Sequence, residues 1–245
     1  MRFHLLSDLH IEFAKFELQK PDGCDFLLLA GDIGSPSTNT YTELIERAAS
    51  LYNIVFVVVG NHECYGYHIE RTCNKIAKIC NRFSNVIYMN NNSYDIDGTD
   101  VRVLGTTLWS NIQDCQRFDV AQFISDFRCI KQWTIEENNH KHFKAVQFLK
   151  KELQRANKDG KRLVVVTHHA PYLRNTSREE HRGSKLSSAF ATDLTPLITY
   201  PVVAWAYGHT HHSNSQIVNG VLLTSNQRGY DGEKTNFDAM FTFEV

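Results

Sequence analysis

The chain has no apolar segment long enough to span a membrane. Its longest unbroken aliphatic or aromatic run is Ile54–Val59, whereas a bilayer-spanning helix needs roughly 20 apolar residues. Near the N-terminus, Asp8 and His10 interrupt the apolar residues before a signal-peptide core could form, and no small-residue cleavage site follows. We therefore expect a cytoplasmic protein with no membrane attachment.

Paired cysteines are missing as well. None of the six cysteines forms a Cys-x-x-Cys pair, and without an export signal reduced thiols are expected rather than a disulfide framework. The chain also lacks internal repeats and linkers rich in Pro, Gly or Ser. We therefore expect a single domain over residues 1–245.

An excess of basic charge is the third absence. Lys and Arg number 26 against 27 Asp and Glu, for a formal net charge of -1. Proteins that bind extended nucleic acid normally carry a basic excess, so we do not expect that function here. The one unusual count is the 12 histidines, which directs attention to metal or acid–base chemistry.

Continuous apolar runs alternate with stretches of helical periodicity. Such runs are typical of strands buried on both faces, and they occupy 2–6, 26–30, 54–59, 101–105, 163–166 and 202–206. Apolar residues at helical spacing predict helices over 41–52, 69–83 and 137–156. Residues 216–224 and 237–245 are expected as final antiparallel strands, with a hairpin signal at Asn219-Gly220. This order predicts an α/β protein with mixed sheets.

Five of the predicted strands end in a short polar segment. The segments are Ser7-Asp8-Leu9-His10, Gly31-Asp32-Ile33-Gly34, Gly60-Asn61-His62-Glu63, Thr167-His168-His169 and Gly208-His209-Thr210-His211. Each segment alone could be turn chemistry. Ligands of open α/β sheets, however, bind beyond the carboxyl ends of the strands. Five segments in the same relation to a strand therefore predict one shared site.

The candidate metal ligands in these segments are two carboxylates, one amide and four imidazoles. They are Asp8, Asp32, Asn61, His10, His168, His209 and His211. Oxygen and imidazole ligands suit Mn, Fe, Zn or Ni better than Ca²⁺ or a thiolate-bound metal. Seven ligands are too many for one tetrahedral ion and fit two ions that share a carboxylate. Paired divalent ions suit an anionic substrate and displacement at phosphorus.

In this order the motifs closely resemble the calcineurin-like metallophosphoesterase superfamily. The matching elements are Asp8-x-His10, Gly31-Asp32, Gly60-Asn61-His62-Glu63, His168 and Gly208-His209-x-His211. The resemblance implies an α/β sandwich of two mixed β-sheets flanked by helices. It also implies a dinuclear metal-dependent phosphohydrolase in which a metal-bridged hydroxide attacks phosphorus directly.

The resemblance further implies a role for each matching residue. One divalent ion (Mn, Fe, Zn, Ni or Mg) would be bound by Asp8, His10, Asp32 and His211. The second would be bound by Asp32, Asn61, His168 and His209, with Asp32 as the bridge. His62 would protonate the leaving group or stabilise the phosphoryl transition state of a small phosphorylated substrate.

The long segment between Asn61 and His168 leaves alternatives open. Residues 106–145 could form a cap that turns Asp126 and Arg128 towards substrate, or a surface insertion with solvated charges. His169 is expected to face substrate or support His168. Monoesters and diesters both remain candidate substrates, and the oligomeric state is open. Alternative functions are an inactive scaffold of the same fold, and a nuclease or cyclic nucleotide phosphodiesterase acting at the same site.

Overall fold

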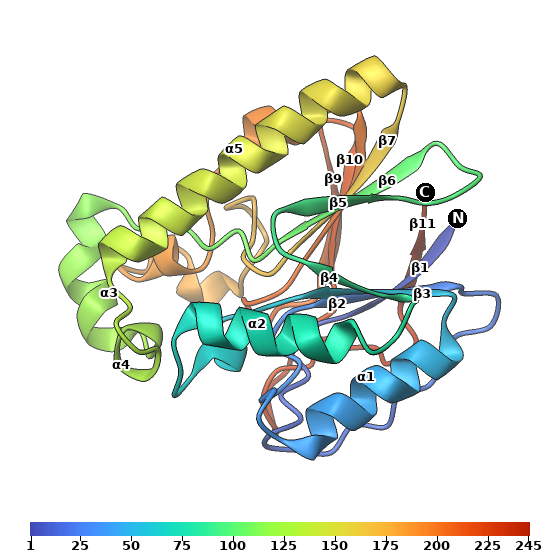
Figure 1. Ribbon diagram of the computed structural model, residues 1–245. Coiled ribbons are helices and arrows are strands. Elements are labelled where there is room, and N and C mark those ends of the chain that lie inside the picture. Colours follow the sequence, from blue (N-terminus) through green and yellow to red (C-terminus); the bar gives the residue numbers. More distant parts are fainter.

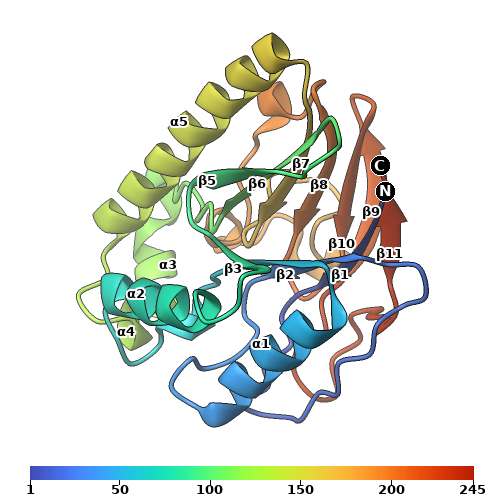
Figure 2. The same ribbon diagram turned by 45° about the vertical axis from the view of Figure 1, so that its right-hand side comes forward.

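Two mixed β-sheets pack face to face, and helices cover the outer side of each sheet (Figure 1 and Figure 2). The computed structural model describes residues 1–245. The architecture confirms the α/β sandwich that the sequence predicted. The chain termini lie side by side, and the Met1 ammonium donates to the Val245 carbonyl at 2.8 Å.

The first sheet has the strand order β11-β1-β2-β3-β4. Its strands are β1 (Arg2–Leu6), β2 (Phe26–Ala30), β3 (Ile54–Val58), β4 (Val86–Met89) and β11 (Thr242–Glu244). Strands β1 to β4 run parallel, and β11 pairs antiparallel with β1. Parallel pairing suits β2 and β3 because both are apolar throughout and are covered on both faces.

The second sheet has the strand order β5-β6-β7-β8-β10-β9. Its strands are β5 (Asn92–Asp95), β6 (Val101–Thr106), β7 (Arg162–Thr167), β8 (Val202–Tyr207), β9 (Asn214–Val218) and β10 (Val221–Ser225). The central strands β6, β7, β8 and β10 run parallel, and the edge strands β5 and β9 are antiparallel to their neighbours. The apolar runs that predicted strands therefore all form strands.

Three long helices cover the sheets. Helices α1 (Asn39–Leu51) and α2 (Ile69–Cys80) lie against the first sheet, and α5 (Ile135–Asp159) lies across the second (Figure 1). The N-cap residue of α5 is Thr134, whose hydroxyl accepts the Glu137 amide at 3.2 Å. Its C-cap residue is Gly160, with φ 64°. These are the usual chemical signals for a helix start and stop. None of the helices has both the length and the apolar composition needed to cross a membrane.

The layer between the sheets is filled with apolar side chains. Its members include Phe3, Leu28, Phe56, Val58, Val103, Val164 and Ala206. The sheets are in close contact at Gly105, where an added Cβ would lie 2.3 Å from the Cβ of Met89. Close packing of this kind fixes the carboxyl ends of the two sets of parallel strands relative to each other.

Two predictions for the C-terminal strands are wrong. Residues 216–224 are not one strand but the β9–β10 hairpin, which turns at Asn219 and Gly220 with φ 51° and 81°. The strand within 237–245 is β11, which pairs with β1 of the other sheet. The reason is that β10 already pairs with β8 on one side and β9 on the other, so it has no free edge. Strands β4 and β5 were not predicted: β4 is apolar but only four residues long, and β5 is equally short and largely polar.

Regular elements occupy both ends of the expected cap at about 106–145. Strand β6 includes Thr106, and residues 135–145 form the first turns of α5. The segment outside the sandwich is therefore 107–134. It contains the short helices α3 (Arg117–Phe123) and α4 (Asp126–Cys129).

Buried His4 makes stability depend on pH. Burial lowers the pKa of His4 from 6.5 to about 4; its Nδ1 lies 2.5 Å from the Tyr52 hydroxyl, and its Nε2 donates to the Ala239 carbonyl. His4 takes up a proton near pH 6.5 in the unfolded chain but only near pH 4 in the folded chain. The free energy of unfolding should therefore fall as the pH is lowered through this window. Urea unfolding of metal-free protein should show wild type losing about 2 kcal/mol more than His4→Gln between pH 7.5 and pH 5. Equal losses would contradict this origin.

Candidate metal centre

The five polar segments meet beyond the carboxyl ends of β1, β2, β3, β7 and β8. Backbone pairing continues past the strand ends, with the Asp8 amide donating to Gly31 at 3.0 Å and the Gly208 amide to His168 at 2.8 Å. Three groups of side chains have possible ligand atoms within 4.8 Å of one another. The groups are Asp8 with His10 and His211, His10 with Asp32 and His62, and Asp32 with His168 and His209.

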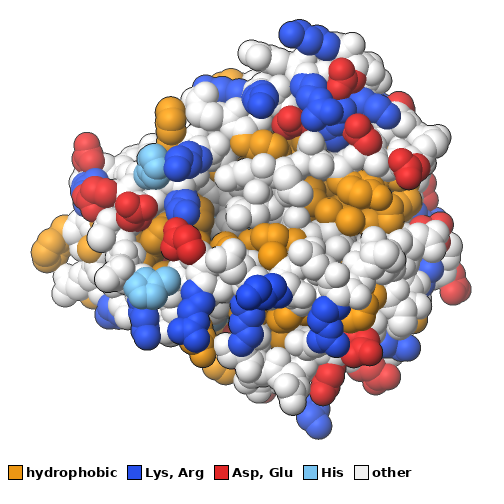
Figure 3. All heavy atoms as spheres, viewed as in Figure 1, with side chains coloured by type: hydrophobic (Ala, Val, Ile, Leu, Met, Phe, Trp, Pro, Cys, Tyr) orange, Lys and Arg blue, Asp and Glu red, His pale blue; other side chains and the backbone are white.

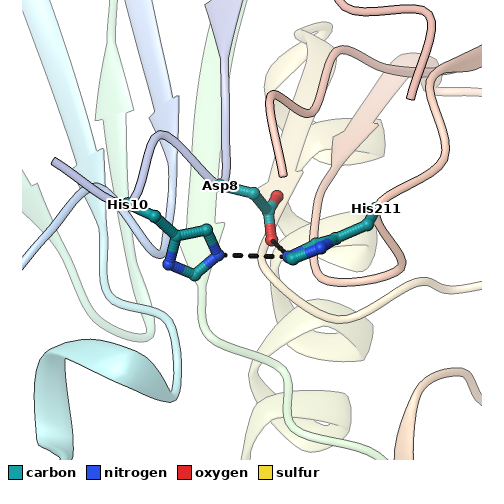
Figure 4. Close-up of side chains that lie close together, drawn as sticks. All are labelled: Asp8, His10 and His211. Carbon is teal, nitrogen blue, oxygen red and sulfur yellow. Dashed lines mark hydrogen bonds and ion pairs between the residues drawn. The ribbon is translucent and has the colours of Figure 1, made fainter. Parts of the chain in front are cut away.

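The first group converges on His211 (Figure 4). His211 Nε2 lies 3.1 Å from His10 Nε2 and 3.5 Å from Asp8 Oδ1. The other nitrogen of each ring donates to a carboxylate, from His10 Nδ1 to Glu12 at 3.2 Å and from His211 Nδ1 to Glu233 at 2.6 Å. In the neutral rings the two Nε2 lone pairs then face each other, an arrangement that a cation between them would stabilise.

A similar arrangement surrounds His168. Its Nδ1 donates to the Ala30 carbonyl at 2.9 Å, and its Nε2 faces Asn61 Oδ1 at 2.9 Å. His209 also places one ring nitrogen, Nε2, against a carbonyl, that of Ala189 at 3.3 Å. Each of these imidazoles therefore keeps one nitrogen free for the shared site.

Asp32 lies between the side chains around His211 and those around His168. Its Oδ2 is 4.0 Å from His10 Nε2 and 3.5 Å from His168 Nε2, while its Oδ1 accepts the backbone amide of His62 at 2.8 Å. Burial opposes ionisation, but the His168, His62 and His10 imidazoles hold the pKa of Asp32 well below its usual range. Asp32 in turn overcomes burial and raises the pKa of His168 to about 10. This position therefore stabilises positive charge beside a buried carboxylate.

Five of the seven predicted ligands have a left-handed backbone conformation. They are Asp8, His10, Asp32, His209 and His211, with φ of 52°, 47°, 52°, 72° and 49°. Positive φ is uncommon outside glycine, and Asp, Asn and His tolerate it best. Strained conformations of this kind cost about 1–3 kcal/mol each and concentrate at functional sites. The backbone is thus bent so that consecutive polar side chains point into one pocket.

Two glycines allow the segments to approach each other. A Cβ on Gly60 would lie 2.1 Å from Asp32 Oδ1, and a Cβ on Gly208 would lie 2.1 Å from Ser7 Oγ and 2.7 Å from Asp8 Oδ2. Any larger residue at either position would displace a predicted ligand.

Glu63 connects the segment that carries Asp32 to the segment that carries Asn61. Its buried carboxylate accepts the backbone amides of Asp32, Ile33 and Gly60 at 3.0, 2.8 and 2.9 Å. Burial and the Asp32 charge raise the pKa of Glu63 to about 8, while its bonds to the amides favour the ionised form. The last residue of the Gly-Asn-His-Glu segment therefore holds the Asp32 and Asn61 loops together, a role that the sequence did not reveal.

His62 lies beside the cluster with both ring nitrogens near polar groups. Its Nδ1 is 3.6 Å from Glu12 Oε1, and its Nε2 is 2.9 Å from the Tyr230 hydroxyl. Burial disfavours the charged ring, but the Asp32 and Glu12 carboxylates outweigh burial and raise the pKa of His62 to about 9. At neutral pH the ring can therefore hold a proton for transfer.

The expected substrate-facing residues have three different surroundings. His169 is buried, its ring centroid 4.0 Å from that of His209, and its Nδ1 has no hydrogen-bond partner. Asp126 is buried, and its Oδ1 accepts from Asn61 Nδ2 at 2.8 Å, which turns the amide oxygen towards His168. Arg128 is exposed and donates to the Gln122 carbonyl on α3, so its guanidinium is engaged within 107–134.

Three further residues at the site were not predicted from the sequence. Glu12, Glu233 and Tyr230 contact His10, His211 and His62 respectively. Glu12 had a signal, because it stands two positions after His10, just beyond the first polar segment. Tyr230 is 168 positions from its partner and Glu233 is 22 positions from its own, and neither follows a predicted strand end. No local pattern marks them.

The donor set fits divalent metal ions. Carboxylate, amide and imidazole groups converge, and the Nε2 atoms of His10 and His211 lie 3.1 Å apart. Ring nitrogens on the far side are held by oxygen atoms, as is typical of metal-binding histidines. The thiols are absent from the cluster: Cys64, the nearest in sequence, is buried against the Gly60 carbonyl.

A family model for calcineurin-like phosphoesterases matches residues 1–213. The chain belongs to this family. The family and the His/Asp clusters together support a metal-dependent phosphoester hydrolase.

The chain is also similar to individual proteins. It is 30% identical over 264 residues to the uncharacterised protein L509 of Acanthamoeba polyphaga mimivirus, covering 95% of this chain and 92% of that protein. Phosphopantetheinyl hydrolase of Mycobacterium tuberculosis shares the fold with a TM-score of 0.71 and 16% identity, over 93% of this chain and 89% of that one. A dimetal phosphatase of Danio rerio has a TM-score of 0.50 and 13% identity, over 92% and 87% of the two chains.

The steric cost of the left-handed backbone at His211 can be measured as a difference in stability between two variants. In metal-free protein, His211→Gly should be more stable than His211→Ala by about 1 kcal/mol, because glycine adopts φ 49° without a steric penalty. Urea unfolding measures the difference. The same pair of substitutions at exposed Lys144 in α5 is the control, where alanine should be the more stable by about 1 kcal/mol. An alanine preference at both positions would refute backbone strain at His211.

Proposed function

We propose that the chain is a dinuclear metal-dependent phosphohydrolase. Asp8, His10, Asp32 and His211 bind one divalent ion, and Asp32, Asn61, His168 and His209 bind the other. The position of Asp32 carries this proposal, since its Oδ2 lies within 4.0 Å of His10 Nε2 on one side and 3.5 Å of His168 Nε2 on the other. The similar structure from Danio rerio is a dimetal phosphatase, which supports the same number of ions here.

The chemistry follows from the charges that the site accepts. When bound, two divalent ions neutralise phosphoryl oxygens and lower the pKa of water towards neutrality. Water then attacks phosphorus directly, and no side chain of the cluster need form a phosphoenzyme. His62 holds a proton and transfers it to the ester oxygen of the leaving group. Glu12, 3.6 Å from His62 Nδ1, stabilises the charged ring before the transfer.

Membership of the phosphoesterase family supports a small phosphorylated substrate. A screen of substrates can then identify the class of phosphoester. The Mycobacterium tuberculosis neighbour is described as a phosphopantetheinyl hydrolase, so phosphopantetheinyl esters belong in a first screen beside monoesters, diesters and cyclic nucleotides. We propose that residues 107–134 act as a cap on the single domain. Asp126 supports this proposal because it reaches from α4 to the Asn61 amide.

An extended nucleic-acid substrate is disfavoured by the surface. A row of basic side chains follows α2 on the face in Figure 3, and Arg71, Lys75 and Lys78 line a hollow of about 830 Å³ there. Acidic and basic side chains are mixed over the rest of this face. A nuclease of extended strands normally carries a broader basic track. An inactive scaffold is disfavoured too, because all seven proposed ligand positions and His62 are filled.

Removing the proposed bridge should remove metal and activity together. Asp32→Ala deletes the one carboxylate shared by both groups, so bound Mn or Zn should fall below two ions per chain and hydrolysis should fall to background. Elemental analysis and a phosphate-release assay measure the two quantities. Asp97→Ala, at an exposed position, is the control and should retain both. Full metal content and turnover in Asp32→Ala would rule out the assignment.

Removing the proposed acid should separate metal binding from turnover. His62→Ala should keep its metal content while kcat falls about 10²–10⁴-fold, and the loss should be larger for alkyl than for nitrophenyl leaving groups. The exposed residue His140, changed to Ala, is the control. An unchanged rate on an alkyl phosphate would exclude His62 from proton transfer.

A further inference from the structure

The segment 228–235 reaches the proposed metal centre from outside the residues that the family model matches. The model ends at residue 213, whereas this segment follows β10 and contributes Tyr230 and Glu233 to the site. The family match therefore assigns these two side chains no role.

The segment is fixed to the loop that carries Asp8 and His10. The Gly229 amide donates to the Asp8 carbonyl at 3.0 Å. The Arg228 guanidinium donates to three carbonyls of the loop, those of Leu9 and Ala14 at 3.0 Å and of Lys15 at 3.1 Å. A charged group that makes several bonds to one loop restrains it strongly. The positions of Tyr230 and Glu233 are therefore set by the site's own first loop.

Tyr230 holds the outer side of His62. Its hydroxyl is 2.9 Å from His62 Nε2, and its ring centroid lies 4.6 Å from that of His10 and 4.8 Å from that of His211. With Glu12 3.6 Å from the other ring nitrogen, His62 is contacted at both ends. Rotation of the His62 ring would break the Tyr230 contact, so the hydroxyl selects the orientation in which Nε2 points to Tyr230.

Glu233 holds the outer side of His211. Its Oε2 accepts from His211 Nδ1 at 2.6 Å and from the Tyr230 amide at 3.0 Å. The first bond fixes the proton on Nδ1 and leaves Nε2 free towards Asp8. Gly229 allows this approach, because it has φ 70° and an added Cβ would lie 2.4 Å from Glu233 Oε2.

We propose that residues 228–233 complete the active site, with Tyr230 as the positioning residue for His62 and Glu233 as the positioning residue for His211. The inference rests on the proposed function, which gives His62 and His211 their roles. It separates into two measurable effects. Tyr230 acts on turnover, whereas Glu233 acts on the binding of metal.

The Tyr230 arm uses Tyr230→Phe, which keeps the ring against His10 and His211 and removes only the hydroxyl. We expect kcat on an alkyl phosphoester to fall about 10-fold, with little change for a nitrophenyl ester and with KM and metal content unchanged. The exposed Tyr200, changed to Phe, is the control. If Tyr230→Phe matches Tyr200→Phe, or loses rate equally on both esters, the positioning role of Tyr230 is overturned.

The Glu233 arm uses Glu233→Gln, which keeps the size of the side chain and weakens the bond to His211 Nδ1. Calorimetric titration of the metal-free protein with Mn²⁺ or Zn²⁺ alone should show a Kd raised about 10–100-fold for one of two ions. Glu43→Gln, at an exposed position on α1, should bind as wild type. An unchanged Kd in Glu233→Gln would overturn this half of the inference.

The two arms also separate this inference from the proposed function. If wild type binds two ions but hydrolyses no phosphoester, the proposed function fails, and the titration of Glu233→Gln still decides the role of Glu233. If wild type hydrolyses phosphoesters and neither Tyr230→Phe nor Glu233→Gln differs from its control, the proposed function stands and the inference fails.

Discussion

The ionised state of the buried Asp32 carboxylate is the interaction on which the rest of the site depends. A buried charge is unfavourable unless it is compensated, and Asp32 finds compensation in His10, His168 and the His62 backbone amide. These partners come from three different polar segments. Removing the carboxylate would therefore disturb the relative positions of the segments as well as one ligand.

The two sheets contribute unequal but complementary parts of this site. The segments after β1, β2 and β3 supply both carboxylates and the amide, while the segments after β7 and β8 supply most of the imidazoles. Neither sheet alone holds a complete set of donors. The site therefore exists only when the apolar layer between the sheets is closed, which connects sandwich packing to chemistry in a direct way.

The sequence predicted the parts of the molecule whose signals are local. Continuous apolar runs marked the buried strands, and the polar segments that follow five of these runs marked the proposed ligand positions, because the chain must leave the sheet there. Strand β4 was missed because its apolar run is only four residues long, and β5 because it is short and largely polar. The partner of β11 depended on which strand edges were still free. Tyr230 and Glu233 were missed because their contacts join distant parts of the chain. The left-handed backbone at the ligand positions was equally invisible, since Asp and His adopt it only when tertiary bonds enforce it.

The left-handed conformation of the ligand residues bears on how the motif would change over evolutionary time. At such positions the backbone itself favours Asp, Asn, His or Gly, whatever the side chain binds. A descendant that no longer needed catalysis would still be under selection for foldability to keep residues from this small set. Substitution of Asp by Asn, or of His by Asn, would then be the first sign of lost activity. A motif search that accepts such exchanges would count inactive relatives as enzymes.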